Sequence, residues 1–331
     1  MRTLVPQINR RTFVTGSMAT AAGALMVTGI DTRPALAKST LSGQAPGYYR
    51  FNIGKFKCAS LSDGTLTLPA EFLARNMPKE KLEEFLKQNY LPLTENISQT
   101  NLTLIDTGEK LVLFDVGSGE NFQESAGKLP ALLETMGIEP EAIDAVVITH
   151  AHPDHVWGLI DEFEEAPRYP NAQYYINATE FDFWNSSDIL TKLPERIHSF
   201  ALGAQRNLKP LAEKMTFIKP GQEFMPGFQA LDTAGHTPGH LSYLVSSEKE
   251  TLLVTGDSMT HFVISLQHPD WQPLTDFDGD LAVKNRKKLM DLAATDRLRV
   301  IGYHLPFPGV GHIGKKDGAY RWIPDGWNWE L

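Results

Sequence analysis

The stretch that decides how this chain folds is Thr149-His150-Ala151-His152-Pro153-Asp154-His155. It follows an apolar, largely β-branched run at residues 145–148, which predicts a buried strand. The apolar residues after it recur at helical spacing, so we expect the histidines to lie on a loop between a strand and a helix. Imidazole nitrogens and carboxylates are suitable ligands for Zn(II) and neighbouring divalent ions. His150 and His152 are two residues apart, so their side chains can bind one ion from the same side. Asp154 and His155 lie across the turn and point away from that ion, so the stretch predicts a second ion.

Three more candidate ligands each come directly after an apolar strand-like run. They are His236 after residues 228–233, Asp257 after residues 251–254, and His304 after residues 299–302. Loops at strand ends are where a rigid scaffold holds ligands in a fixed geometry. The full set is five histidines and two aspartates. If these seven ligands are divided between two ions, one carboxylate has to bridge the ions.

The remaining pattern alternates strands and helices in two blocks. Strands are expected at residues 48–53, 56–61, 65–68, 101–105, 110–114, 173–176 and 241–245, with a turn at Ser62-Asp63-Gly64. Amphipathic helices are expected within residues 70–94, 128–137, 179–184, 186–214 and 278–296. Both strand blocks end in candidate ligands, which predicts an α+β fold of two sheets packed face to face, with helices outside and the site along one edge. We expect residues 38–331 to form a single domain.

Composition narrows the function classes. Hydrophobic residues make up 42% and charged residues 21% of the 331 residues, as in ordinary globular proteins. The formal net charge of −9 argues against nucleic acid or an anionic membrane as a partner. Cys58 is the only cysteine, so no intrachain disulfide can form, and we expect it to be a buried apolar residue.

Residues 1–37 are interpreted as a twin-arginine signal peptide. Asn9-Arg10-Arg11-Thr12-Phe13-Val14 precedes a mildly apolar stretch, and Ala35-Leu36-Ala37 offers a cleavage site of small residues. The twin-arginine machinery exports folded proteins, which suits a chain whose metal binding and folding are coupled. We therefore expect a periplasmic or secreted protein.

The ligand string resembles the signature of a known superfamily. His150-x-His152-x-Asp154-His155, followed by His236, Asp257 and His304, is similar in order and approximate spacing to the metallo-β-lactamase superfamily, whose αββα sandwich matches the predicted architecture. A closer resemblance, over most of residues 38–331, is to the branch that contains methyl parathion hydrolase and the lactonases. It is carried by residues 45–50, 61–65, 235–240 and 304–313.

The resemblance implies a division of the ligands. His150, His152 and His236 would hold one metal, Asp154, His155 and His304 the other, and Asp257 would bridge them. It also suggests a homodimer. Two divalent ions, with Zn(II) preferred, would supply a bridging hydroxide and stabilise the oxyanion, and Asp154 would orient the hydroxide or receive its proton. The implied reaction is hydrolysis of a lactone, an aryl ester or an organophosphate triester.

The substrate pocket is expected to be apolar and to take a small neutral ester. The resemblance implies an aromatic rim near Phe122, Trp184 and Phe200, and the predicted lining also includes His261, four residues past Asp257, and Phe307. Two other functions are kept open: a thioesterase similar to glyoxalase II on the same fold, and a metal-binding protein without turnover. A covalent serine route has no support, since the sequence contains no Gly-x-Ser-x-Gly motif.

Overall fold

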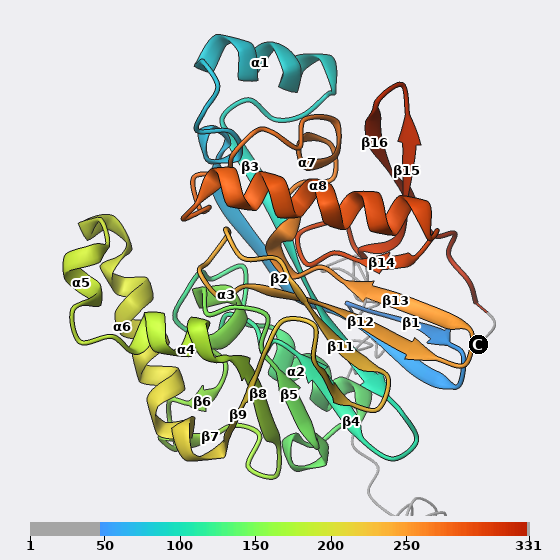
Figure 1. The fold of residues 1–331 in the computed structure, drawn as a ribbon. Helices are drawn as coiled ribbons and strands as arrows, with labels where there is room; N and C mark the ends of the chain where they lie inside the picture. Colours follow the sequence, from blue (N-terminus) through green and yellow to red (C-terminus); the bar gives the residue numbers. More distant parts are fainter. Residues whose placement is uncertain (1–46, 330–331) are drawn as a thin grey trace, which may run out of the picture. The chain divides into compact units, whose positions relative to one another are not determined.

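The computed structural model describes residues 47–329, and the predicted signal peptide lies outside them. Two seven-stranded mixed sheets dominate the fold (Figure 1). In the order of the sheet, the first contains β1 (Tyr48–Ile53), β2 (Phe56–Pro69), β3 (Glu95–Asp106), β4 (Leu111–Phe114), β5 (Ala145–Val147), β8 (Gln173–Asn177) and β9 (Met215–Ile218). The second contains β10 (Glu223–Met225), β11 (Phe228–Asp232), β12 (Leu241–Ser247), β13 (Glu250–Val254), β14 (Arg299–Ile301), β15 (Val310–Lys316) and β16 (Ala319–Pro324).

Helices and one small hairpin complete the described chain. The α-helices are α1 (Lys79–Gln88), α2 (Leu129–Met136), α3 (Pro153–Val156), α4 (Ala178–Asn185), α5 (Ile189–Lys192), α6 (His198–Leu208), α7 (Ile264–Gln267) and α8 (Gly279–Thr295). Short 3₁₀ turns lie at η1 (Ala70–Leu73), η2 (Pro140–Ala142), η3 (Glu195–Ile197), η4 (Lys209–Lys214) and η5 (Gly256–Ser258). The hairpin consists of β6 (Ile160–Asp161) and β7 (Ala166–Pro167). Within residues 47–329, every helix is too short or too polar to cross a lipid bilayer.

The predicted αββα sandwich is confirmed by how the central strands divide their side chains. In β4, Val112 and Phe114 join the apolar cluster between the sheets, whereas Leu113 packs on the helical side. In β13, Leu252 faces the same inter-sheet cluster and Leu253 faces the cluster that includes α8. Because alternate side chains point to opposite faces, strands that are apolar throughout are buried on both sides.

Two local predictions are wrong. No turn interrupts the chain at residues 62–64: β2 continues through a bulge between Ser62 and Thr65. The Asp63 carboxylate turns inward there and accepts backbone N–H bonds from Ser118, Gly127 and Leu129 at 2.8–3.0 Å. The helix expected after the ligand string instead starts within it, and α3 ends at Val156. Gly158 then packs so closely that a Cβ there would lie 2.2 Å from the Val116 carbonyl oxygen.

Candidate metal centre

The candidate ligands sit where strands of both sheets end at the same edge. β5 leads to the 149–155 stretch, while β11, β13 and β14 lead to His236, Asp257 and His304. Strands β13 and β14 are parallel, and β11 runs in the same direction because β12 is antiparallel to both β11 and β13. A backbone bond from Leu241 N–H to the Thr149 carbonyl, 3.0 Å, joins the two edges. The structure thus brings together all seven residues that the sequence predicted.

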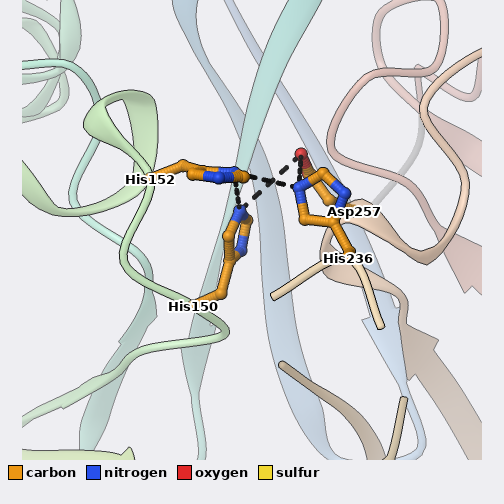
Figure 2. A group of neighbouring side chains, drawn as sticks. All are labelled: His150, His152, His236 and Asp257. Carbon is orange, nitrogen blue, oxygen red and sulfur yellow. Dashed lines mark hydrogen bonds and ion pairs between the residues drawn. The ribbon is translucent and has the colours of Figure 1, made fainter. Parts of the chain in front are cut away.

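The first metal group consists of His150, His152, His236 and Asp257 (Figure 2). One donor atom from each residue lies within 4.8 Å of the others, and all four side chains are buried. His152 Nδ1 lies 3.0 Å from both His150 Nε2 and His236 Nε2. Asp257 Oδ2 lies 3.3 Å from His236 Nε2 and 3.8 Å from His150 Nε2.

The second metal group consists of Asp154, His155 and His304, again with donor atoms within 4.8 Å of one another. Asp257 reaches this group as well: its Oδ1 lies 3.2 Å from His155 Nε2, and its Oδ2 lies 3.1 Å from His304 Nε2. This carboxylate therefore stands between the two groups, in the position that a bridging ligand would occupy.

In three of the five ligand histidines, the ring nitrogen that faces away from the ligand group is held by a fixed acceptor, which orients the ring. His155 Nδ1 lies 2.8 Å from Asp115 Oδ2, and His236 Nδ1 lies 2.9 Å from Asp276 Oδ1. His304 Nδ1 donates to the Gln99 carbonyl at 2.7 Å. Such acceptors leave the opposite nitrogen of each ring free to bind a metal.

The electrostatics of the centre keep its carboxylates charged and two of its histidines neutral. Burial lowers the pKa of His152 to about 3, and burial with repulsion from His155 lowers the pKa of His150 well below its usual value. Burial also opposes the charge on Asp257, but His304, His155 and His150 hold the pKa of that carboxyl well below its usual range. Neutral imidazoles and ionised carboxylates bind divalent ions, so the shifts at His150, His152 and Asp257 favour binding. The pKa values of His155, His236 and His304 are raised instead, because the carboxylates that face them outweigh the effect of burial.

The donor atoms fit divalent ions at both groups. Among the described residues, Asp154 Oδ2, Asp257 Oδ1 and His155 Nε2 are buried and have no hydrogen-bond partner. Buried polar atoms without partners are rare and costly, and an ion that accepts their lone pairs removes the cost. The two groups are therefore metal-binding clusters, each with the mixed nitrogen and oxygen ligands that suit Zn(II) and related ions.

A cavity of about 460 Å³ opens onto the second group and onto His152 and Asp257. Phe122 and Phe200, both predicted pocket residues, line it and contact each other edge to face, with ring centroids 5.8 Å apart. Most of the lining is apolar: Leu66, Leu68, Phe72, Leu73, Leu193, Ile197, Pro273, Leu274 and Phe277 contribute to it. Three basic side chains that the sequence did not single out, Arg75, Lys192 and Arg196, also line it.

Three predicted pocket residues do not line this cavity. Trp184 is completely buried in the helical core and packs against the ring of His152, 5.8 Å between centroids. His261 is buried, and its Nδ1 accepts the backbone N–H groups of Val263 and Ile264. Phe307 packs against the apolar cluster between the sheets. Trp184 was placed by the resemblance, and His261 and Phe307 lie close in sequence to Asp257 and His304; neither argument determines where a side chain points.

Several supporting residues were missed. Asp115 follows β4 directly, as the ligands follow their strands, and this signal could have found it. Asp276 and Glu180 lie in a loop and a helix, far in sequence from the groups that they contact, so no local pattern marks them. Tyr303 stacks on His155 with centroids 3.9 Å apart, and only its position next to His304 hints at a role.

Comparison with known proteins agrees with this geometry. The family model of the metallo-beta-lactamase superfamily matches residues 96–304. An N-acyl homoserine lactonase from a Bacillus species is 25% identical over 243 residues, which cover 67% of this chain and 84% of that protein. The solved structure of AidC, a dizinc quorum-quenching lactonase, is 30% identical, has a TM-score of 0.79, and covers 85% of this chain and 98% of its own. The solved structure of the hydrolase AbOPH is 29% identical, also with a TM-score of 0.79, over 86% of this chain and 100% of its own.

The matched region spans more than half of the chain and contains all seven ligand residues. The fold, the ligand residues and the relatives support one conclusion. The chain belongs to the metallo-beta-lactamase superfamily and is a metal-dependent hydrolase.

Proposed function

We propose that this hydrolase uses two Zn(II) ions to open a lactone ring that carries an apolar acyl chain. The observation that supports it is that four of the seven ligand residues, His152, Asp154, Asp257 and His304, line a largely apolar cavity of about 460 Å³. A cavity of this size suits a small molecule with one reactive polar group and an apolar remainder. Relatives named as N-acyl homoserine lactonases favour the lactone over other esters.

The protein side chains have separate tasks in this reaction. When bound, two divalent ions lower the pKa of water toward neutrality and polarise the carbonyl oxygen of the ester. Asp257 keeps the two ligand groups together, since its two oxygens face different histidines. Asp154 lines the cavity, and its Oδ2 has no hydrogen-bond partner among the described residues, so it is placed to orient water or accept its proton. Phe122 and Phe200 exclude bulk water from one wall of the cavity.

A substrate panel on the metal-loaded protein tests this proposal. An N-acyl homoserine lactone, an aryl ester, a phosphotriester and a glutathione thioester are compared by kcat/KM, together with metal analysis of the same sample. We expect the lactone to be hydrolysed most efficiently and the metal content to be two Zn(II) per chain. A preference for the thioester would favour the glyoxalase-II-like alternative. Two bound metals without turnover of any ester would favour a metal-binding protein.

The three basic side chains of the cavity refine the panel. Arg75 and Arg196 are exposed, and Lys192 pairs with Asp188 at 2.8 Å. Lactones with a neutral and with a carboxylate-terminated acyl chain therefore belong in the same comparison. We expect the neutral chain to be preferred, because the lining of the cavity is mainly apolar.

We also propose that the protein is exported in its folded form. The support is the Arg10-Arg11 pair with the apolar stretch after it, all of which lies outside the described residues. Replacing both arginines by lysine should keep the protein in the cytoplasm, as measured by fractionation of the host cells. Equal export of the variant and the parent would contradict the twin-arginine route.

A further inference from the structure

Glu180 is a buried carboxylate that takes no part in the proposed chemistry. It lies in the first turn of α4 with no exposed surface, and it accepts four hydrogen bonds. Its Oε1 accepts from Ala151 N–H at 2.9 Å and from Trp184 Nε1–H at 2.7 Å. Its Oε2 accepts from the Thr237 hydroxyl at 2.7 Å and from Gly239 N–H at 2.9 Å. All four partners are donors, which suits an ionised carboxylate with every lone pair in use.

The four donors come from the supports of a single metal group. Ala151 lies between His150 and His152, whereas Thr237 and Gly239 follow His236. Trp184 packs its ring against that of His152. The second metal group has its own supports, which do not include Glu180: the Asp115 carboxylate, the Gln99 carbonyl and the Tyr303 ring.

We propose that Glu180 is a positioning residue that fastens the two ligand loops of the first metal group together, and so sets the affinity of that group for its metal. The proposal rests on the metal binding that the proposed function requires, but it is independent of the substrate. The four hydrogen bonds of the Glu180 carboxylate go to residues between and beside the ligands and to Trp184, so it acts through them.

The fit between α4 and the 236–240 loop supports this role. A Cβ at Gly239 would lie 2.3 Å from the Glu180 backbone nitrogen, so the loop rests directly on the first turn of the helix. Asn177, the N-cap of α4, donates from its side-chain amide to the Gly239 carbonyl at 2.9 Å. The loop is therefore held by α4 on both its N–H and its carbonyl side.

The energetic reason is preorganisation. The nitrogens of His150 and His236 lie 3.0 Å from His152 Nδ1, although they belong to loops far apart in sequence. Converging lone pairs repel one another until a cation lies between them, so free loops would separate in the absence of metal. Because the Glu180 carboxylate bonds both loops, the free energy needed to hold them together is supplied when the chain folds, and metal binding does not have to supply it.

The test compares Glu180→Gln with Asp63→Asn in the full chain. Asp63 is a matched control, because it is also buried and accepts several backbone N–H bonds, but those groups belong to residues 118–129 and carry no ligand. Each protein is stripped of metal, titrated with Zn(II) against a competing chelator, and titrated with Co(II), whose visible spectrum reports the ligand geometry. Thermal unfolding of each metal-free variant measures the general loss of stability.

In Glu180→Gln we expect one of the two equivalents of Zn(II) to bind about 10- to 100-fold more weakly, as is typical when a residue that orients ligands is altered. The other equivalent should keep its affinity, and Asp63→Asn should keep both although it unfolds at a lower temperature. If Glu180→Gln keeps both affinities, or weakens the same equivalents as Asp63→Asn, the inference is wrong.

A milder variant covers the case in which Glu180→Gln does not fold. Thr237→Val removes a single donor to Glu180 and is expected to weaken the same equivalent by a smaller factor, and unchanged affinity would again refute the role. If the parent chain itself binds no divalent metal, the proposed function fails, which is a different result from equal binding by parent and variant.

Discussion

At the residue scale, the position of Asp257 between the two metal groups has a measurable consequence. Replacing Asp257 by Asn keeps the shape but removes the charge that four histidines face. We expect metal content to fall and kcat/KM to drop by more than about 100-fold, since even residues behind the ligands are worth about 10- to 100-fold. Metal analysis and lactone hydrolysis on the same sample check this. Normal turnover by the variant would contradict the bridging position.

Phe200 offers a second test at the same scale, directed at the cavity. Its ring lies 6.0 Å from that of His152 and lines the wall next to the ligands. Phe200→Ala should raise KM about tenfold or more for a long acyl chain and less for a short one, because burying a phenyl ring is worth about 1.5–3 kcal/mol. Leu202→Ala is the control: this residue belongs to the same helix, is 54% exposed and does not line the cavity. Equal effects of the two substitutions would argue against an acyl site at Phe200.

Residue types in a strand context were enough to predict the ligands, but not the residues around them. His236 and His304 were found because each follows an apolar run, and the structure places both at the centre. Trp184 and Phe307 carry no comparable signal, since an aromatic side chain packs into a core as readily as into a cavity. Glu180 acts through contacts across 29 and 57 residues of sequence, to Ala151 and Thr237, which no local pattern encodes.

At the scale of elements, α8 shows how a local signal can be tested. Two aspartates lie at the start of this helix, and Asp278 caps it: its carboxylate accepts from Leu281 N–H at 3.0 Å, whereas Asp280 lies in the first turn. Asp278→Ala should lower the free energy of unfolding by about 1 kcal/mol, the typical value of an N-cap. Asp280→Ala removes a favourable charge in the first turn, worth about 0.3–1 kcal/mol, together with an exposed hydrogen bond from the Gln272 side-chain amide at 2.9 Å. Denaturant unfolding of both variants measures the two losses of free energy of unfolding. A larger loss for Asp280→Ala than for Asp278→Ala would contradict the assignment of the cap to Asp278.

The strands differ in how far they could be predicted. Strands that are apolar throughout, such as β4 and β5, were found with bounds close to those observed. The bulge in β2 was predicted as a turn because Asp63-Gly64 has the composition of one. Pairing with β3 on both sides of the bulge, and the distant backbone N–H groups that bond the Asp63 carboxylate, are long-range contacts that the local sequence does not show. The β15–β16 hairpin was missed; its strands mix apolar residues with glycine, proline and charged residues and are partly exposed, so they lack the apolar run or strict alternation that marks a strand.

At the scale of the whole molecule, the centre exists only when the two sheets are packed together. His150, His152, Asp154 and His155 follow a strand of the first sheet, whereas His236, Asp257 and His304 follow strands of the second. Each metal group takes ligands from both sheets. Metal binding therefore stabilises the contact between the two halves of the sandwich, and folding of that contact assembles the centre.

Metal removal should consequently lower the stability of the whole sandwich. A ligand present at 100 times its Kd adds about 2.7 kcal/mol, so two such ions add about 5 kcal/mol. For a domain of this size that corresponds to a fall in Tm of about 10 °C or more after treatment with a chelator. Calorimetry of the loaded, stripped and reloaded protein checks the value, and Tm should rise with the concentration of free Zn(II). Asp257→Asn is the control, because a chain that no longer binds both ions should lose less Tm on chelation. Identical melting of the loaded and stripped parent, with two ions present by metal analysis, would show that the ions do not couple the two sheets.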